Sequence, residues 1–306
     1  MSFEVTTAFR KEYSASFMLL FQQLQSKLET VVRRETQNSE EKFWDFIGQT
    51  STKKNRARAS KTPRMNTPHS RRRCTLDSFT WADTTSDLDK IQMMKDPTSD
   101  YLRSAVGALN RAKDETLLLA MGATAFTGKK GEVSMAAKDE CTLINGDGTV
   151  VGAGSDFSDT TETALTIAKI GLIGELMDDA SVPQEGRYIV TNPYNKWQLL
   201  QDTKIGSADY NKIKALYEGE ISDFMGFNFV FLPSDRFEVN STDTGCIECF
   251  GFQRDSVLLA TGKEITTKVD PLPDENYDIQ AFAEMFIGAV RMQGSGVVPI
   301  LLKKAA

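Results

Sequence analysis

Residues 96–122 read DPTSDYLRSAVGALNRAKDETLLLAMG, and this stretch predicts the longest helix of the chain. Asp96 is a good N-cap, and Pro97 suits the first helical position because a helix start leaves that N–H unbonded anyway. Gly122 suits the C-terminal stop. At 1.5 Å per residue, a helix from Pro97 to Met121 is about 37 Å long, which is typical of a spine. The residues expected on its buried face are Tyr101, Leu102, Ala105, Leu109, Ala112, Thr116 and Leu119.

Upstream of this helix lies a basic segment between two strand-like runs. Residues 43–48 (FWDFIG) and 74–83 (CTLDSFTWAD) predict strands, and the apolar parity slips between Leu76 and Phe79, which allows a bulge. The polar, proline-containing connection between the runs predicts an extended hairpin that projects from the body. Residues 51–73, the basic segment, contain no Asp or Glu. Its nine bases are Lys53, Lys54, Arg56, Arg58, Lys61, Arg64, Arg71, Arg72 and Arg73.

Three interpretations of the basic segment remain open. It could neutralise nucleic-acid phosphates, although it lacks the interleaved aromatic residues that stack on single-stranded bases. It could dock on an acidic surface of an identical neighbour, since the whole chain has a formal charge of −6 and the remainder is therefore acidic. It could also be a solvated loop. The docking interpretation predicts that replacing Arg71, Arg72 and Arg73 by Glu leaves the monomer folded and impairs assembly.

Residues 1–35 predict an amphipathic helix, because Phe17, Leu20, Phe21, Leu24 and Leu28 recur at helical spacing. The apolar stripe needs a surface to cover it. That surface could belong to the same domain, or the segment could be an arm that reaches a neighbouring subunit.

The downstream part predicts mixed helices and strands. Residues 144–148 predict a hairpin turn, and a helix is expected from Asp159, with Glu162 placed as in a capping box. The apolar face of this helix would comprise Leu165, Ala168, Leu172, Ile173 and Leu176. A strand at 186–191 leads into a short helix at 194–202 with Trp197 and Leu200 on one side. Further strands are expected at 227–232, 246–252, 277–291 and 297–302. Without regular strand–helix alternation, the fold class is α+β.

The chain offers little for catalysis or cofactor binding. His69 is its single histidine, which removes most Ser-His and Cys-His schemes. Cys246 and Cys249 form a lone CxxC within a predicted strand, and buried free thiols are the simpler interpretation for all four cysteines. No phosphate-binding glycine motif is present. We therefore expect no enzyme, catalytic residue, cofactor or metal. No run of about 18 apolar residues and no signal peptide is present, so no membrane association and a cytoplasmic place of assembly are expected.

The order of the predicted elements resembles the major capsid proteins of tailed bacteriophages, which have the Hong Kong 97-type fold. The stretches that carry the resemblance are residues 186–200 (GRYIVTNPYNKWQLL), 219–232 (GEISDFMGFNFVFL) and 282–302, with GAVR at 288–291. Residues 66–73 and 81–83 also look familiar from one subgroup of these proteins. By this resemblance, the chain divides into an N-terminal arm (1–35), an extended loop hairpin (36–86), a spine helix with peripheral domain (87–180), a mainly axial domain (181–270) and C-terminal strands returning to the peripheral domain (271–306).

The resemblance implies a structural protein of the virion that self-assembles into pentamers and hexamers of an icosahedral shell around double-stranded DNA, without sequence-specific binding. It implies assembly in the host bacterial cytoplasm, with separate scaffolding, portal and decoration proteins as candidate partners. The bases of the basic segment would contact one neighbour, and Phe17, Phe21 and Leu24 of the arm would contact another. An encapsulin-like nanocompartment shell and a nucleic-acid-binding protein that uses residues 51–73 are the alternatives.

Overall fold

The computed structural model describes residues 22–54, 64–86, 98–158, 161–201, 224–239, 245–275 and 277–304. The chain divides into two compact units. Unit 1 comprises Met1–Gln25, Phe79–Arg111 and Ile265–Met285. Unit 2 comprises Ser26–Ser78, Ala112–Glu264 and Phe286–Ala306. The division into five parts expected from the sequence stays a prediction.

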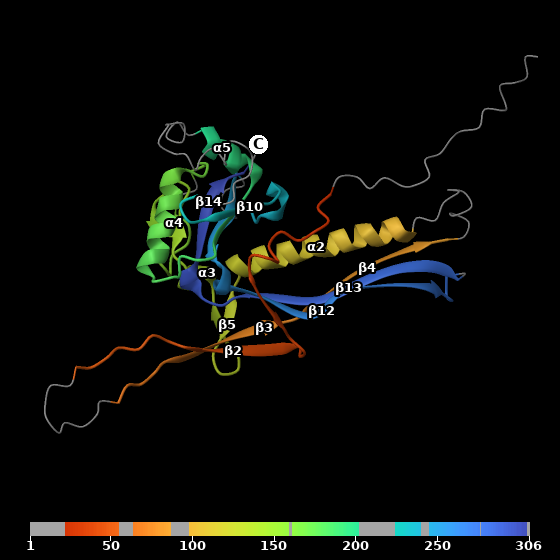
Figure 1. Ribbon diagram of the computed structural model, residues 1–306, viewed down its shortest axis with the longest axis horizontal. Helices are drawn as coiled ribbons and strands as arrows, with labels where there is room; N and C mark the ends of the chain where they lie inside the picture. Colours follow the sequence, from red (N-terminus) through yellow and green to blue (C-terminus); the bar gives the residue numbers. More distant parts are fainter. Residues whose placement is uncertain are drawn as a thin grey trace, which may run out of the picture. The chain divides into compact units, whose positions relative to one another are not determined.

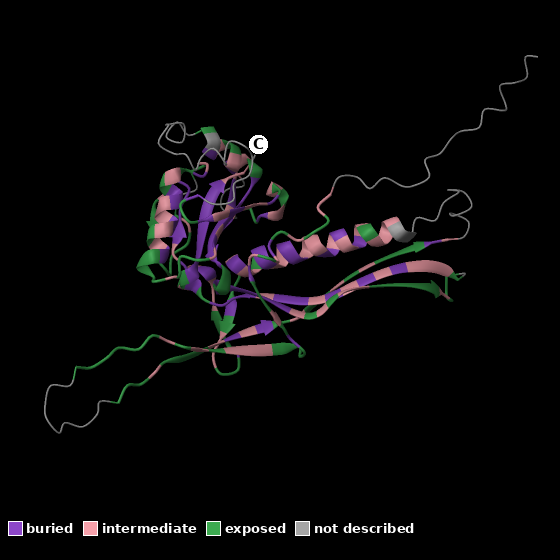
Figure 2. Cartoon of the chain, viewed as in Figure 1, coloured by how far each residue is buried: buried purple, intermediate pink, exposed green. Residues whose placement is uncertain are grey.

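The core of unit 2 is a six-stranded mixed sheet with the order β10-β9-β11-β14-β7-β8. Strand β11 is antiparallel to both β9 and β14, whereas β9–β10 and β14–β7 are parallel pairs. Apolar residues fill most positions of β7, β9, β11 and β14, which explains why most of their side chains are buried (Figure 2). The strands are β7 (Leu143–Ile144), β8 (Val150–Val151), β9 (Arg187–Thr191), β10 (Asn228–Phe231), β11 (Cys246–Gln253) and β14 (Val297–Lys303).

Helix α4 (Ile167–Asp179) packs on this sheet beside the short helix α5 (Pro193–Gln201) (Figure 1). A Cβ added at Gly251 of β11 would lie 2.8 Å from Cγ2 of Ile173, so the helix contacts the strand where no side chain intervenes. The N-cap of α4 is Thr166. The start expected at Asp159 falls outside the described residues, and residues 161–166 are not helical.

The buried face of α4 is also displaced from the expected one. Lys169, Ile170, Ile173 and Met177 are buried, whereas Ala168 is exposed. In α5, Trp197 is 59% exposed, and the side chain of Leu200 is not described. Leu165 and Ile173 are buried as expected, so apolar spacing predicted the contact face of the longer helix in part, and it was wrong for Ala168 and Trp197.

Unit 2 contains a hairpin of β2 (Glu41–Ile47) and β3 (His69–Thr75), but its second strand lies mainly in the basic segment, and most of the predicted second strand, 74–83, belongs to another sheet. The strands are antiparallel and run from the pair Glu41–Thr75 to the pair Ile47–His69. They belong to a four-stranded sheet of order β2-β3-β5-β6, with β5 at Ala125–Thr127 and β6 at Val133–Met135. Leu76 separates β3 from β4 (Asp77–Thr85), which is where the apolar parity slips.

A third sheet, of order β1-β12-β13-β4, has strands with residues in both units. Strand β1 (Arg33–Thr36) pairs in parallel with β12 (Val257–Leu272), and β13 (Asp278–Arg291) follows after a turn. The sequence did not predict β12, because its outer half is polar. The amphipathic helix predicted for residues 1–35 is wrong for the described part, since residues 22–32 form turns and loop.

Helix α2 (Thr98–Gly122) confirms the predicted long helix. Asp96 and Pro97 lie outside the described residues. Ala105 and Leu109 are buried as expected in unit 1, but Leu119 in unit 2 is 47% exposed. The buried residues of that last part are Leu117, Leu118 and Met121 instead.

Candidate assembly interface

Beyond Ile47 and His69, the hairpin continues as two exposed segments without regular structure. Gly48 N–H donates to the carbonyl of Pro68 (2.8 Å), which joins the two segments at the end of the strand pair. Residues 49–54 and 64–67 then lead away from the body of unit 2 (Figure 1). A projection of this kind exposes its side chains to solvent or to another molecule.

Three bases of the basic segment, which we call the outer bases, lie on these segments. Lys53, Lys54 and Arg64 are exposed, and no ion pair joins them to another described residue. Arg56, Arg58 and Lys61 lie outside the described residues. The outer bases therefore keep their charges available.

Arg71 and Arg73 lie at the root of the hairpin and have partners in their own chain. Nε of Arg71 is 2.6 Å from Oδ1 of Asp45, and the guanidinium lies over the ring of Phe43. The hydrogen bond from Arg71 lowers the pKa of the Asp45 carboxyl. Arg73 is 3.3 Å from Glu41, and its guanidinium is 4.7 Å from the ring centroid of Phe126. Each arginine is thus held by one carboxylate and one aromatic ring.

Arg72 points the other way, into unit 2. Its side chain is buried, forms an ion pair with Glu140 of α3 (Ala137–Glu140) and donates from Nε to the carbonyl of Met292 (3.2 Å). The burial of Arg72 argues against the expectation that replacing all three arginines by Glu leaves the monomer folded. A glutamate there would bury a second negative charge beside Glu140.

Arg291 completes a buried Arg–Glu–Arg cluster. It is fully buried at the end of β13, and its Nε lies 3.5 Å from Oε2 of Glu140. Its Nη1 donates to the carbonyls of Met121 (2.8 Å) and Ala123 (2.9 Å) at the end of α2. Because helix C-termini present unpaired carbonyls and partial negative charge, this cation caps the spine helix. The cluster joins the hairpin root to the end of α2 within unit 2.

A second buried charge holds the chain that precedes β1. Asp114 of α2 is 1% exposed, and its Oδ1 accepts hydrogen bonds from Ser26 Oγ (2.6 Å), Lys27 N (3.1 Å) and Leu28 N (3.0 Å). The neighbouring Lys113 lies 3.2 Å from Glu29. These contacts hold residues 26–29 as a turn on the helix, and this is the physical reason that no helix forms there.

Residues 22–24 lie on α2 in unit 1. Asn110 donates to the carbonyl of Leu24 (2.8 Å), and Arg111 donates to the side-chain oxygen of Gln22 (2.9 Å) and to the carbonyl of Gln23 (3.0 Å). Leu24 is 39% exposed. The other two predicted arm residues, Phe17 and Phe21, lie outside the described residues.

Sequence reasoning missed Glu140, Arg291 and Asp114. A lone arginine at the end of the apolar strand-like run 281–291 was the available signal for Arg291, because a buried guanidinium needs several acceptors. The partner carbonyls are about 170 positions away in the sequence, so no local pattern could identify them.

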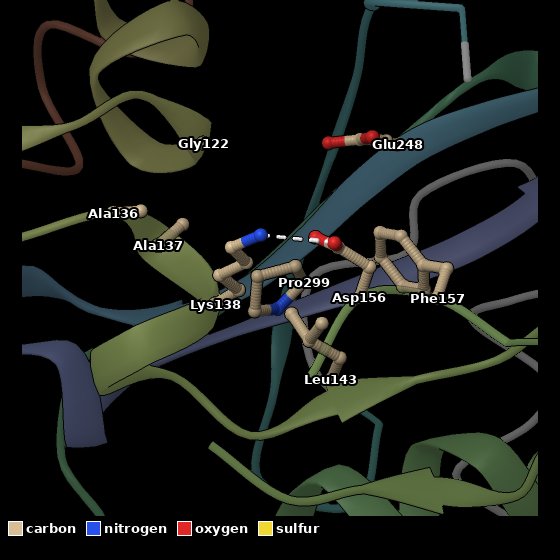
Figure 3. A pocket seen from close by; sticks show the side chains of 9 residues that line it. All are labelled: Gly122, Ala136, Ala137, Lys138, Leu143, Asp156, Phe157, Glu248 and Pro299. Carbon is tan, nitrogen blue, oxygen red and sulfur yellow. Dashed lines mark hydrogen bonds and ion pairs between the residues drawn. The ribbon is translucent and has the colours of Figure 1, made fainter. Parts of the chain in front are cut away.

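A pocket of about 260 Å³ in unit 2 lies between α3 and the six-stranded sheet. Nζ of Lys138 and Oδ2 of Asp156 meet there at 2.9 Å, near the carboxyl of Glu248 (Figure 3). Burial, and then the charge of Glu238, raises the pKa of Glu248. The nine lining residues include no serine, threonine, cysteine or histidine, so the pocket offers no side-chain nucleophile of these kinds.

Lys169 and the four cysteines are further buried groups among the described residues. Lys169 donates to Thr163 Oγ1 (2.7 Å), and burial lowers its pKa to about 8. All four cysteines are free and buried, which confirms the thiol interpretation, and burial raises the pKa of Cys249 to about 12. Among the described residues, no group of three or more His, Cys, Asp or Glu could hold a metal, and no helix is long and apolar enough to span a membrane.

Solved phage capsids share this fold over nearly their whole length. The capsid of the cyanophage P-SCSP1u matches with a TM-score of 0.73 and 16% identity, covering 100% of this chain and 96% of the other. The capsid of the Helicobacter pylori bacteriophage KHP30 gives 0.72 and 12%, covering 100% and 99%. The structure from Mycobacterium phage Che8 matches with a TM-score of 0.67 and 18% identity, covering 95% of this chain and 97% of the other. No curated protein sequence matches the chain.

The architecture is therefore the Hong Kong 97-type capsid fold, as the resemblance of the sequence implied. A family model described as "Phage capsid protein" matches residues 5–304, and the chain belongs to this family. Membership implies a structural role in a phage virion and association with copies of itself in a shell.

Proposed function

We propose that the chain is the major capsid protein of a tailed bacteriophage and that its copies assemble into the pentamers and hexamers of an icosahedral shell. The shell would be assembled in the host bacterial cytoplasm and would enclose double-stranded DNA without sequence-specific binding. The supporting observation is that the family match extends from residue 5 to residue 304, over both units. Scaffolding, portal and decoration proteins would be separate chains.

The hairpin is the proposed contact with a neighbouring copy. Its outer bases are exposed without a described partner, and Arg56, Arg58 and Lys61 would add to their charge. Arg71 and Arg73 retain partly exposed side chains and could extend the same contact, whereas Arg72 supports it from inside. In the N-terminal arm, Phe17, Phe21 and Leu24 are the proposed contact residues.

Electron microscopy of the purified protein, paired with size exclusion, tests the shell. Closed particles, pentamers or hexamers are the expected result. A species that stays monomeric even when the other proteins of its phage are supplied would contradict the proposal.

The alternative in which the basic segment binds nucleic acid makes a different prediction. It requires the free monomer to bind DNA with strong salt dependence and to lose this affinity when residues 51–73 are deleted. Shells that form normally after that deletion would contradict the proposed hairpin contact.

A further inference from the structure

The turn between β12 and β13, in unit 1, concentrates negative charge. Residues 268–278, the acidic turn, contain four carboxylates and one lysine. Asp270, Asp274 and Glu275 are exposed and Asp278 is partly exposed. No ion pair joins any of these four carboxylates to a described base. The charge is therefore available to another molecule.

The described residues of the acidic turn also expose apolar surface. Tyr277 is 69% exposed and Val269 is 44% exposed. The N–H groups of Glu275 and Tyr277 both donate to the carbonyl of Leu272, at 3.2 and 3.0 Å. Tyr277 has a φ of 62°, a conformation that residues other than glycine rarely adopt. The described residues of the turn thus present an exposed aromatic ring together with exposed carboxylates.

The hairpin root shows how this chain holds a base. Arg71 has Asp45 and the ring of Phe43, and Arg73 has Glu41 and the ring of Phe126. The acidic turn offers the same two groups, carboxylates and an exposed ring, and no ion pair joins these carboxylates to a described base. The outer bases are the complementary surface, since they are exposed and have no described acid.

We propose that the acidic turn of one copy is the docking surface for the outer bases of a second copy. The inference rests on the proposed shell function and names the surface that the hairpin contacts. Asp270, Asp274 and Glu275 would receive the ammonium and guanidinium groups, and the ring of Tyr277 would stack on one of them. Two different surfaces of one chain then meet head to tail, which lets contacts repeat around a ring.

Zero-length carbodiimide cross-linking of assembled protein tests the contact on the native chain. The reagent joins a lysine amine to a carboxylate only when the two groups touch. Particles are assembled from equal amounts of unlabelled and ¹⁵N-labelled chains, and cross-linked peptides are identified by mass spectrometry. We expect Lys53 or Lys54 joined to Asp270, Asp274 or Glu275, with both isotopes in one product.

A charge-neutralising variant of the acidic turn is compared with a control variant at a different exposed acid. Asp274→Asn with Glu275→Gln should abolish the cross-link to these positions and lower the assembled fraction several-fold at low salt. Asp235→Asn, at another exposed acid in unit 2, should change neither. The effect of the turn variant should shrink as salt rises, because the screening length falls to ~10 Å at 0.1 M and to ~3 Å at 1 M.

The outcomes separate the two proposals. Particles in which Lys53 and Lys54 are cross-linked to other carboxylates, or only within one isotope, overturn the docking surface and leave the shell standing. Protein that forms no particle or capsomer even when the other proteins of its phage are supplied overturns both proposals.

Discussion

The root and the outer part of the same hairpin use the same residue types in opposite ways. At the root, Arg72 is buried against Glu140 and the carbonyl of Met292, and it stabilises its own subunit. Farther out, Lys53 and Lys54 are exposed and have no described partner. A run of like charges in a sequence can therefore contain both a structural support and a free contact surface. Burial distinguishes them, and residue type does not.

The largest expected effect comes from a substitution at the buried root of the hairpin. Arg72→Leu removes one of the two cations beside Glu140 and should lower the free energy of unfolding by about 3 kcal/mol, at the low end of the range for a broken buried ion pair because Arg291 remains. Urea denaturation of the subunit measures the loss. Lys53→Leu is the matched control and should leave the urea midpoint unchanged. Equal midpoints for the two variants would contradict the assigned difference.

The next effect concerns the buried carboxylate on α2. Asp114→Ala leaves the N–H groups of Lys27 and Leu28 without their acceptor, and an unsatisfied buried group costs about 1–3 kcal/mol. The free energy of unfolding should fall by that amount. Residues 26–29 should also exchange their amide hydrogens faster, which hydrogen exchange with mass spectrometry can follow. An unchanged exchange rate would show that Asp114 does not hold the turn.

Charge reversal at the exposed end should separate assembly from stability. Lys53→Glu with Lys54→Glu should leave the urea midpoint unchanged, because these side chains are exposed and have no described partner. The same variant should lower the yield of particles, most strongly at low salt, where exposed charges are least screened. Light scattering at two salt concentrations measures the yield. Normal assembly of this variant at low salt would contradict the proposal that the hairpin contacts a neighbouring copy.

A further effect is a pH dependence of stability that comes from Lys169. Burial lowers its pKa to about 8, below the unfolded value of about 10.4, so the unfolded chain binds more protons between these limits. Its contribution to the free energy of unfolding therefore increases as pH rises through that window. The buried thiols of Cys74, Cys141 and Cys249 act in the opposite direction, because burial raises their pKa values.

The difference between wild type and Lys169→Met isolates the lysine, since both chains carry the same thiols. The free energy of unfolding of the wild type minus that of the variant, measured with urea from pH 7 to pH 10, should rise with pH. A flat difference would mean that the buried lysine keeps its ordinary pKa.

The sequence predicted the parts of the fold that local patterns determine. Helix α2 and strand β2 follow from apolar spacing, whereas β3, which pairs with β2, lies mainly in the basic segment that was expected to be the connection. The helix predicted for residues 22–32 is wrong, because Asp114, more than 80 positions away, accepts hydrogen bonds from the backbone N–H groups of a turn there. Strand β12 was missed because its polar outer half pairs with neighbouring strands and carries little apolar signal.

The candidate site could be predicted only in part. The concentration of charge in the basic segment is visible in the sequence, and so is the acidity of the remaining chain. Which bases are buried was not visible, because Arg72 meets Glu140 and Met292 only after the chain has folded. Its partner at position 292 lies 220 residues along the chain.

The position of β14 has a consequence for synthesis on the ribosome. This strand lies inside the six-stranded sheet, between β11 and β7, yet it follows all its partners in the sequence. The sheet cannot close until residues 297–303 have left the exit tunnel, so each nascent chain remains without its finished core during most of translation. A prematurely terminated chain would lack an interior strand. Chaperones or proteases should remove this truncated chain before it is incorporated into a growing particle.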